Sequence, residues 1–401
     1  MPTESTSFPS ESLSSRLVCH LDYAQWDPNN ESSSNSHAFV TSLRKAMLGI
    51  GFFYLHNTPL SHQPTRARMF TLLDRFYALP LATRLRIDMA QSRHFRGYSK
   101  FADEVTKGQL DMRDQVDYAT HVAPLDVDAR LLREKPFLNL YGWNQFLPDD
   151  VLSGHEEIVS DWFSKAEGIN RQITRALELA LGVPAKRLSQ YLEETPFHED
   201  GEKDEVPRKC GPLPYARMKT IRYPAGEIVD GIARVPGSQQ GVGAHKDGGW
   251  LTLLAPSEVP GLQVQDFDGN WLSVPYIPNT ILVNFGQQVE NVTAGLAQAA
   301  THRVVASGTA EQATRYSVAW FSLPALNARL QPLNTAVELG KEVVDEWRAL
   351  QSERCGKKIV CDVPKGDLFP GAGEEFGWIA WRGLARSHPR VVERFYADLI
   401  A

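Results

Sequence analysis

The sequence predicts a mostly β protein with flanking helices, built around a closed barrel or jelly roll. From Tyr215 onward, short apolar runs alternate with Gly, Pro, Asn and Asp. Many short strands at such regular spacing are typical of barrels and jelly rolls. Before Tyr215, apolar residues recur instead at three- and four-residue steps, which is the period of helices that cover a core. The β-rich part is therefore expected to form the centre of the molecule.

The individual elements follow from these two periodicities. We expect helices over residues 38–48, 62–80 and 151–182, and the last of them ends at Gly182-Val183-Pro184. A short buried strand is expected at Phe52-Phe53-Tyr54-Leu55, after the first helix. Asp268-Gly269 indicates a hairpin turn within the β-rich part. Eight strands are expected there, at 215–223, 242–246, 250–255, 261–265, 271–276, 279–285, 302–306 and 316–322.

Four segments divide the chain by composition. We expect a flexible N-terminal segment (1–37), a helical N-terminal region packing on the barrel (38–214), the β core (215–325) and a C-terminal helical extension (326–401). Within the second segment, the mixed-charge stretch 193–212 is predicted to be an exposed loop. Within the extension, helices are predicted at 335–353 and 389–399, with a Gly/Pro-rich loop at 364–377 between them.

Composition excludes several classes of protein. Hydrophobic residues make up 42% and charged residues 22%, which is ordinary for a globular protein. A net charge of −6 offers no basic field for nucleic acid or an anionic membrane. Four scattered cysteines indicate a reducing compartment and no disulfide framework. No secretory signal or run of 18 apolar residues is present, so we expect a cytoplasmic protein without membrane or nucleic-acid partners. The oligomeric state stays open.

The motif His-x-Asp occurs at His20/Asp22, His198/Asp200 and His245/Asp247. On a strand, residues two apart point to the same face, so both side chains can reach one metal ion. Alone, each pair is more often a surface turn or a satisfied polar pair. Only the third lies in the β-rich part, between glycines, and the first two lie in polar segments where solvated side chains are expected.

Two further residues follow the third pair in strand positions. His302 opens the β-branched run Val304-Val305, and Arg315 and Ser317 begin the next strand. On one strand face, Arg315 and Ser317 can bind a carboxylate through a bidentate guanidinium and a hydroxyl. A plain surface cation is the alternative for Arg315, and the apolar run after Ser317 disfavours it.

Two histidines and one carboxylate form the facial triad of non-haem iron(II) oxygenases. His245, Asp247 and His302 are therefore the predicted metal ligands. Three ligands on one face leave three positions, two for a 2-oxo acid and one for dioxygen. No cysteine lies near the cluster in the sequence, which disfavours a structural zinc site. The sequence thus predicts iron(II), with 2-oxoglutarate and O2 as co-substrates and ascorbate as a stimulant in vitro.

The ordered motifs resemble the isopenicillin N synthase-like iron/2-oxoglutarate dioxygenases over about residues 38–325. The matching segments are Gly243-Ala-His-Lys-Asp-Gly-Gly-Trp, Gly261-Leu-Gln-Val-Gln, Gly269-Asn-Trp, Asn284-Phe-Gly, Thr301-His-Arg-Val, Arg315-Tyr-Ser, Gly51-Phe-Phe-Tyr-Leu and Phe95-Arg-Gly-Tyr. The resemblance implies a double-stranded β-helix core, iron on His245, Asp247 and His302, and 2-oxoglutarate on Arg315 and Ser317. It also implies that Tyr223 contacts the co-substrate.

We accordingly expect an enzyme that hydroxylates, desaturates or cyclises a small molecule, in secondary metabolism. Expected substrate contacts are Phe95, Arg96, Tyr98, Phe101, Trp250 and Phe321. The C-terminal extension is expected either to shape this site or to pack outside it. One alternative is a related oxidase that uses no 2-oxoglutarate and binds a substrate carboxylate through the Arg-x-Ser pair. The other is a non-catalytic jelly-roll binding protein, which the intact triad disfavours.

Overall fold

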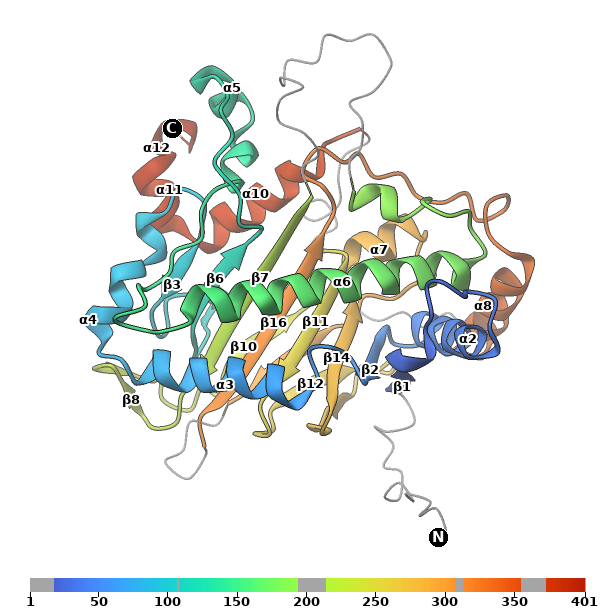
Figure 1. The fold of residues 1–401 in the computed structure, drawn as a ribbon, viewed down its shortest axis with the longest axis horizontal. Helices are drawn as coiled ribbons and strands as arrows, with labels where there is room; N and C mark the ends of the chain where they lie inside the picture. Colours follow the sequence, from blue (N-terminus) through green and yellow to red (C-terminus); the bar gives the residue numbers. More distant parts are fainter. Residues whose placement is uncertain (1–17, 107, 194–213, 307–312, 355–372, 401) are drawn as a thin grey trace.

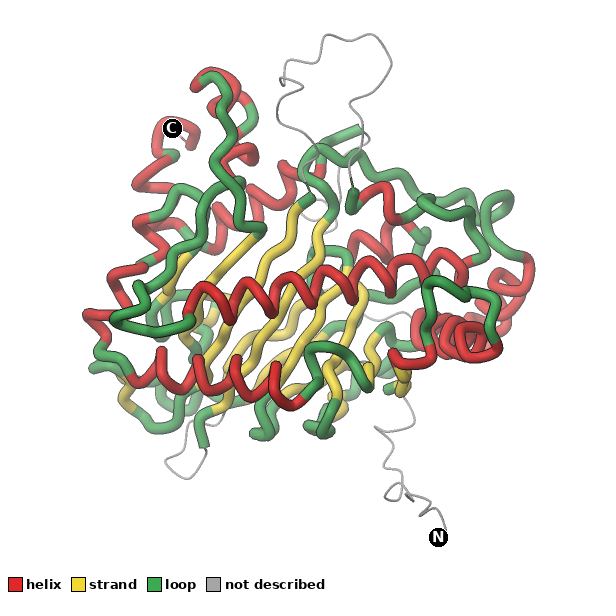
Figure 2. Tube along the Cα trace, in the orientation of Figure 1, coloured by secondary structure: helices red, strands yellow, loops and turns green. Residues whose placement is uncertain are grey.

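Two β-sheets face each other at the centre of the protein, and helices cover the outer face of the larger sheet (Figure 1). The computed structural model describes residues 18–106, 108–193, 214–306, 313–354 and 373–400. Figure 2 shows the strands gathered in the middle of the molecule and the helices around them. The mostly β class with flanking helices, predicted from the sequence, is confirmed.

The large sheet has eight strands. Their order is β1 (Cys19–Asp22), β2 (Phe52–His56), β14 (Thr280–Phe285), β11 (Leu251–Pro256), β16 (Arg315–Leu323), β7 (Tyr215–Tyr223), β6 (Asp114–Ala119) and β3 (Gly97–Ser99). Neighbours are antiparallel except β1 and β2. The four central strands and β2 were predicted. On one side β2 and β1 extend the sheet, and on the other side β6 and β3 of the N-terminal region extend it. That region is therefore part of the sheet as well as a helical cover.

The small sheet completes the jelly roll. It consists of β10 (Gln240–His245), β15 (His302–Val305), β12 (Leu262–Gln265) and β13 (Trp271–Ser273), all antiparallel. Apolar side chains such as Val264 and Val304 meet Ile221 and Leu282 of the large sheet in a common core. The sheets stay separate, so the jelly roll is confirmed, and the alternative of a closed barrel was wrong.

Three long helices form a second layer. They are α2 (Ser34–Leu48), α3 (Gln63–Ala78) and α6 (His155–Leu181), and Figure 1 shows α3 and α6 lying across the large sheet. Buried residues of α6, such as Trp162 and Ile173, belong to the apolar core cluster that also holds Trp320 of the sheet. Gly182 ends α6 with φ 70°, a left-handed conformation that glycine adopts without strain.

The C-terminal extension has helices α8 (Lys341–Glu353), α10 (Phe376–Ser387), α11 (Pro389–Phe395) and α12 (Ala397–Ile400). The predicted loop at 364–377 lies largely outside the described residues, and α10 was not predicted at all. Phe376, Ile379 and Trp381 of α10 are buried in the main core. Trp378 of the same helix meets Phe137 edge to face. The extension is therefore an integral part of the molecule.

Shorter elements connect these layers. They are α4 (Leu81–Arg84), α5 (Ala129–Glu134), α7 (Gln287–Val292), β4 (Val105–Thr106), β5 (Gln109–Leu110), β8 (Ile228–Val229) and β9 (Ile232–Ala233). Short 3-10 turns lie at 23–25, 85–87, 89–91, 136–140 and 189–191.

Residues 1–37 were expected to be flexible, but β1 and the start of α2 fall in this range. The predicted loop 193–212 lies outside the described residues except Glu193. No helix in the described ranges is long and apolar enough to cross a bilayer.

Candidate metal centre

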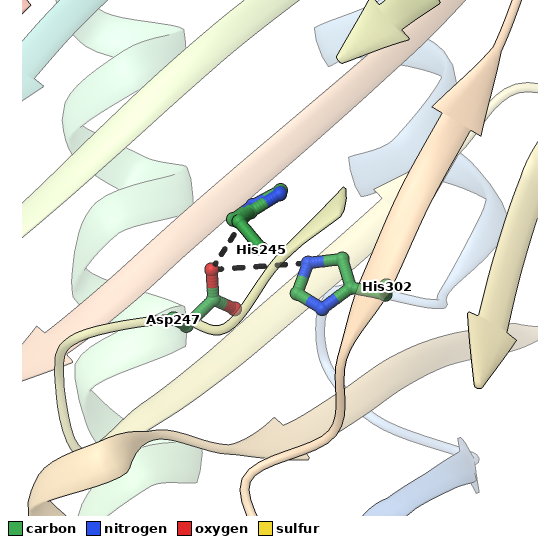
Figure 3. Close-up of side chains that lie close together, drawn as sticks. All are labelled: His245, Asp247 and His302. Atoms are coloured by element: carbon green, nitrogen blue, oxygen red, sulfur yellow. Dashed lines mark ion pairs between the residues drawn. The ribbon is translucent and has the colours of Figure 1, made fainter. Parts of the chain in front are cut away.

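The three predicted ligands meet at one edge of the small sheet (Figure 3). His245 ends β10, His302 begins β15, and the strand register pairs the two residues. Asp247 follows β10, and its Oδ1 lies 3.6 Å from Nε2 of His245 and 3.8 Å from Nε2 of His302. Ligands about 2.1 Å from a shared ion lie roughly 3 to 3.6 Å apart, so the three side chains could close on one metal ion with small adjustments.

Each ligand is oriented by a hydrogen bond on the side away from this centre. Nδ1 of His245 donates to the carbonyl of Gly243 at 2.8 Å, and Nδ1 of His302 donates to the carbonyl of Ala300 at 3.1 Å. A carbonyl can only accept, so both rings carry their proton on Nδ1 and leave Nε2 free to bind a metal. Such outer contacts fix the tautomer and the direction of metal-binding histidines.

Asp247 is held in the same manner by two side chains of the large sheet. Its Oδ2 accepts hydrogen bonds from Thr252 at 2.6 Å and from Asn284 at 2.8 Å, which leaves Oδ1 for the metal. Neither Thr252 nor Asn284 was predicted as a site residue. Asn284 could have been found, because it is a lone amide in the apolar strand Thr280–Phe285.

The charge states suit a divalent cation. Burial, reinforced by the neighbouring His302, lowers the pKa of His245 to about 4, so the ring is neutral near pH 7. Burial alone would raise the pKa of Asp247, but the two imidazoles and the hydrogen bonds from Asn284 and Thr252 outweigh it. The pKa of Asp247 is therefore lowered and the group is ionised. Two imidazoles whose Nε2 atoms are free and one ionised carboxylate form the donor set of a facial iron(II) site.

A buried guanidinium lies on the inner face of the large sheet. Arg315 is 1% exposed, and its Nη1 donates to the hydroxyl of Ser317 at 2.6 Å. Its guanidinium lies over the ring of Tyr223, 5.1 Å from the centroid. Among the described residues no carboxylate is within ion-pair distance of Arg315, and its Nε lacks a hydrogen-bond partner. A buried cation without a protein counter-ion can accept an anionic ligand.

The predicted substrate contacts divide into two groups. Phe321 faces the space between the sheets, opposite Thr252 and Arg217. Trp250 instead donates to Thr174 of α6, on the helix side of the sheet. Tyr98 donates to Asp114, whose carboxylate also pairs with Arg222. Trp250 and Tyr98 therefore do not line the metal side, and the predictions for them were wrong.

The other three predicted contacts are buried in structural roles. Arg96 donates to the carbonyls of Leu140 and Gly142 and is fully enclosed. The ring of Phe95 stacks on Tyr396 of the C-terminal extension. Phe101 packs with Met112 and Val229 in a small separate cluster. Their packing shapes the surrounding segments, and it gives no direct evidence of contact with a substrate.

The jelly roll, the facial donor set and the unpaired arginine together define a non-haem iron oxygenase. The family model described as "2OG-Fe(II) oxygenase superfamily" matches residues 218–324. A second model, "non-haem dioxygenase in morphine synthesis N-terminal", matches residues 20–145. The chain belongs to the 2-oxoglutarate- and iron(II)-dependent oxygenase superfamily.

Named relatives agree with this assignment. A "2-oxoglutarate-dependent dioxygenase frbJ" from Dothideomycetidae sp. (strain 11243) is 27% identical over 91% of this chain and 89% of its own length. A "homoarginine-6-hydroxylase" from Glycine max is 27% identical over 90% of this chain and 98% of its own length. A full-length Neurospora crassa protein, solved in complex with alpha-KG and 5-formyluracil, has a TM-score of 0.62 at 19% identity, and the match covers 83% of this chain and 96% of that one. This last likeness shows the shared fold.

The protein is thus an enzyme, a non-haem dioxygenase that oxidises a small molecule. Its family uses iron(II), 2-oxoglutarate and O2, as expected from the sequence. The donor atoms of His245, Asp247 and His302 suit the iron, and the unpaired guanidinium of Arg315 suits the dicarboxylate.

Proposed function

We propose that His245, Asp247 and His302 bind the iron and that Arg315, Ser317 and Tyr223 bind 2-oxoglutarate, in an enzyme that hydroxylates a small organic molecule. One observation carries the metal assignment. Both Nε2 atoms and Oδ1 of Asp247 point to one centre, while the second polar atom of every ligand is already occupied by a protein partner.

Iron(II) with 2-oxoglutarate and dioxygen supplies the oxidising power to remove hydrogen from an unactivated C–H bond. The protein side chains bind, orient and shield. Thr252 and Asn284 hold Asp247 so that one oxygen stays directed at the metal. Arg315 and Ser317 offer guanidinium and hydroxyl donors to the distal carboxylate of 2-oxoglutarate. The apolar side chains between the sheets keep water away from these charged contacts.

Hydroxylation is favoured among the possible outcomes by the relatives. The homoarginine-6-hydroxylases of Glycine max and Arabidopsis thaliana align with 90% and 83% of this chain. A related oxidase without 2-oxoglutarate is the second candidate, because 1-aminocyclopropane-1-carboxylate oxidases also align, over 75% of the chain. Stoichiometric release of succinate distinguishes the two candidates.

The variant Asp247→Ala tests the metal site. It removes the only anionic ligand, so we expect iron to be lost on gel filtration after anaerobic loading. Activity is expected to fall by more than about 100-fold. The matched control is Asp22→Ala, which removes the carboxylate of another His-x-Asp motif and should keep both iron and activity. Stoichiometric iron in the Asp247→Ala protein, measured by metal analysis, would contradict the assignment.

A further inference from the structure

Strand β10 ends at the metal ligand His245, yet its own sheet holds it incompletely. It lies at the edge of the small sheet, and among the described strands it pairs with β15 alone. The register between these two strands shifts twice, once on each side of Val242. An irregular edge strand keeps backbone groups that the ladder does not bind. The position of His245 therefore depends on what else contacts β10.

A hairpin of the N-terminal region lies against this strand. It is formed by β4 and β5 and continues into Asp111 and Met112. The backbone N–H of Met112 donates to the carbonyl of Gln240, the first residue of β10, at 2.9 Å. Nε2 of Gln240 lies 3.3 Å and 3.2 Å from the carbonyl oxygens of Thr106 and Gln109. These bonds fasten the start of β10 to the hairpin.

Asp111 extends the contact along β10 toward the metal ligand. It is fully buried, and its Oδ1 accepts from Nε2 of Gln240 at 3.0 Å and from the backbone N–H of Gly243 at 3.4 Å. Its Oδ2 accepts from the hydroxyl of Thr106 at 2.8 Å and lies 3.2 Å from the guanidinium of Arg113. The carboxylate therefore has partners on both oxygens and bridges the hairpin to β10.

Gly243 connects this bridge to the metal ligand. Its N–H contacts Asp111, and its carbonyl accepts from Nδ1 of His245 at 2.8 Å, the bond that leaves Nε2 directed at the metal. Glycine also lets the hairpin approach, because a Cβ at this position would lie 2.7 Å from Cγ2 of Thr106. A displacement of Gly243 would therefore move the acceptor that orients the imidazole.

We propose that Asp111 is a positioning residue for the iron site, which fixes Gly243 and through it the imidazole of His245. This inference rests on the proposed function, because it concerns the same metal ligands. Without Asp111, the N–H of Gly243 and the amide of Gln240 lose a buried acceptor, which favours rearrangement of β10. Outer contacts of metal ligands typically change metal affinity by about 10- to 100-fold.

The variant Asp111→Ala tests this role through metal binding, which requires no turnover. The metal-free protein is titrated anaerobically with iron(II), and separately with cobalt(II), whose visible absorption reports the geometry of its ligands. We expect the dissociation constant for iron(II) to rise about ten-fold or more, and the cobalt(II) spectrum to change. Asp111→Asn keeps an acceptor oxygen, so its dissociation constant should stay within about three-fold of the parent value.

The matched control is Asp88→Ala. Asp88 likewise accepts from a backbone N–H, that of Ala90, and pairs with an arginine, Arg390, but neither partner belongs to β10. This variant should bind iron as the parent does. Thermal unfolding of the metal-free proteins separates a loss of iron affinity from a loss of folding. If Asp111→Ala does not fold, Gln240→Met replaces it with the same expectation, because it removes the side-chain bonds from β10 to the hairpin.

Three results would overturn the inference. They are parent iron affinity in folded Asp111→Ala, iron binding by Asp111→Asn as weak as that of Asp111→Ala, and an equal loss of affinity in Asp88→Ala. The variant Asp247→Ala tests the proposed function separately. If it keeps its iron, the assigned ligands are wrong and both proposals fail. If it loses iron while Asp111→Ala binds iron as the parent does, the metal site stands and only the role of Asp111 is refuted.

Discussion

At the scale of single residues, the site is defined by which polar atoms already have partners. Asp247 has one oxygen bonded to Thr252 and Asn284 and one that faces the two imidazoles. Arg315 donates a hydrogen bond to the hydroxyl of Ser317, and no carboxylate among the described residues forms an ion pair with it. An isolated buried charge is costly, so an arginine of this kind is stable when a bound anion completes its hydrogen bonding. The structure therefore contains complementary positions for a cation and for an anion.

Replacing Arg315 tests the anion position. Arg315→Gln removes the charge-assisted contact proposed for the distal carboxylate of 2-oxoglutarate. The 2-oxoglutarate concentration for half-maximal succinate release should therefore rise ten-fold or more, about 1.4 kcal/mol per decade. Iron content should be unchanged. The control is Arg68→Gln, which breaks a surface ion pair with Glu157. A variant with an unchanged 2-oxoglutarate requirement but weaker use of its organic substrate would support the oxidase alternative.

At the scale of elements, eight of the ten strands of the β-rich part were predicted within a few residues, because apolar runs bounded by turn residues mark them. The two-residue strands β8 and β9 were not predicted. Strand β6 escaped prediction. Its sequence Asp-Gln-Val-Asp-Tyr-Ala is polar, yet all six residues are buried. Asp114 pairs with Arg222 and Asp117 with Arg217 of the neighbouring strand. Ion pairs between strands take the place of apolar contacts, and a hydrophobic pattern cannot reveal them.

Helix α10 escaped prediction for a different reason. Gly377 and Gly383 lower its helix propensity and suggest a loop. The glycine at 377 is required by packing, because a Cβ there would lie 2.3 Å from the ring of Phe137.

At the metal site, the three predicted ligands come together, but the direction in which the side chain of Trp250 points was not predicted. It precedes β11, and strand alternation cannot be applied before the register is known.

The attachment of the C-terminal helices provides an element-scale test. Tyr396 follows α11, stacks on Phe95 with ring centroids 5.7 Å apart and donates a hydrogen bond to the carbonyl of Arg93. Tyr396→Ala should lower the free energy of unfolding by about 3 kcal/mol, as expected for loss of a buried aromatic ring. Urea denaturation measures the change. The control Val337→Ala, at a 78% exposed position of the extension, should stay within about 0.5 kcal/mol of the parent.

At the scale of the whole molecule, buried histidines link stability to pH. Burial lowers the pKa of His155 to about 4, and His155 accepts a hydrogen bond from the backbone of Leu147. Burial also lowers the pKa of His388 to about 4, against the opposing charge of Glu104. In the unfolded chain both titrate near 6.5, so below that pH the unfolded state binds more protons than the native state. Stability is therefore lost as the pH falls from 6.5 toward 4.

The size of this loss follows from linkage. His245, whose pKa is also lowered to about 4, makes a third contribution in the iron-free protein. Lowering the pH from 7.5 to 5.5 should therefore reduce its free energy of unfolding by about 4 kcal/mol, roughly 1.4 kcal/mol for each of the three histidines. His155→Gln should lower stability at pH 7.5 and remove about a third of the pH dependence. The control His37→Gln changes an exposed histidine of α2 and should leave the pH dependence of stability unchanged. Equal urea midpoints at both pH values would contradict the prediction.

The pairing of β2 with β14 has a consequence for how the protein is made. Phe53 of β2 pairs with Val283 of β14, roughly 230 residues later in the chain. At ribosomal rates of 5–20 residues per second, β2 waits roughly 10 to 45 seconds before its partner strand has been synthesised. During this interval a strand of Phe, Tyr and Leu presents an unpaired edge, which is a template for aggregation. We therefore expect co-expressed molecular chaperones to raise the yield of folded protein, because they can cover this edge until the second half of the chain emerges.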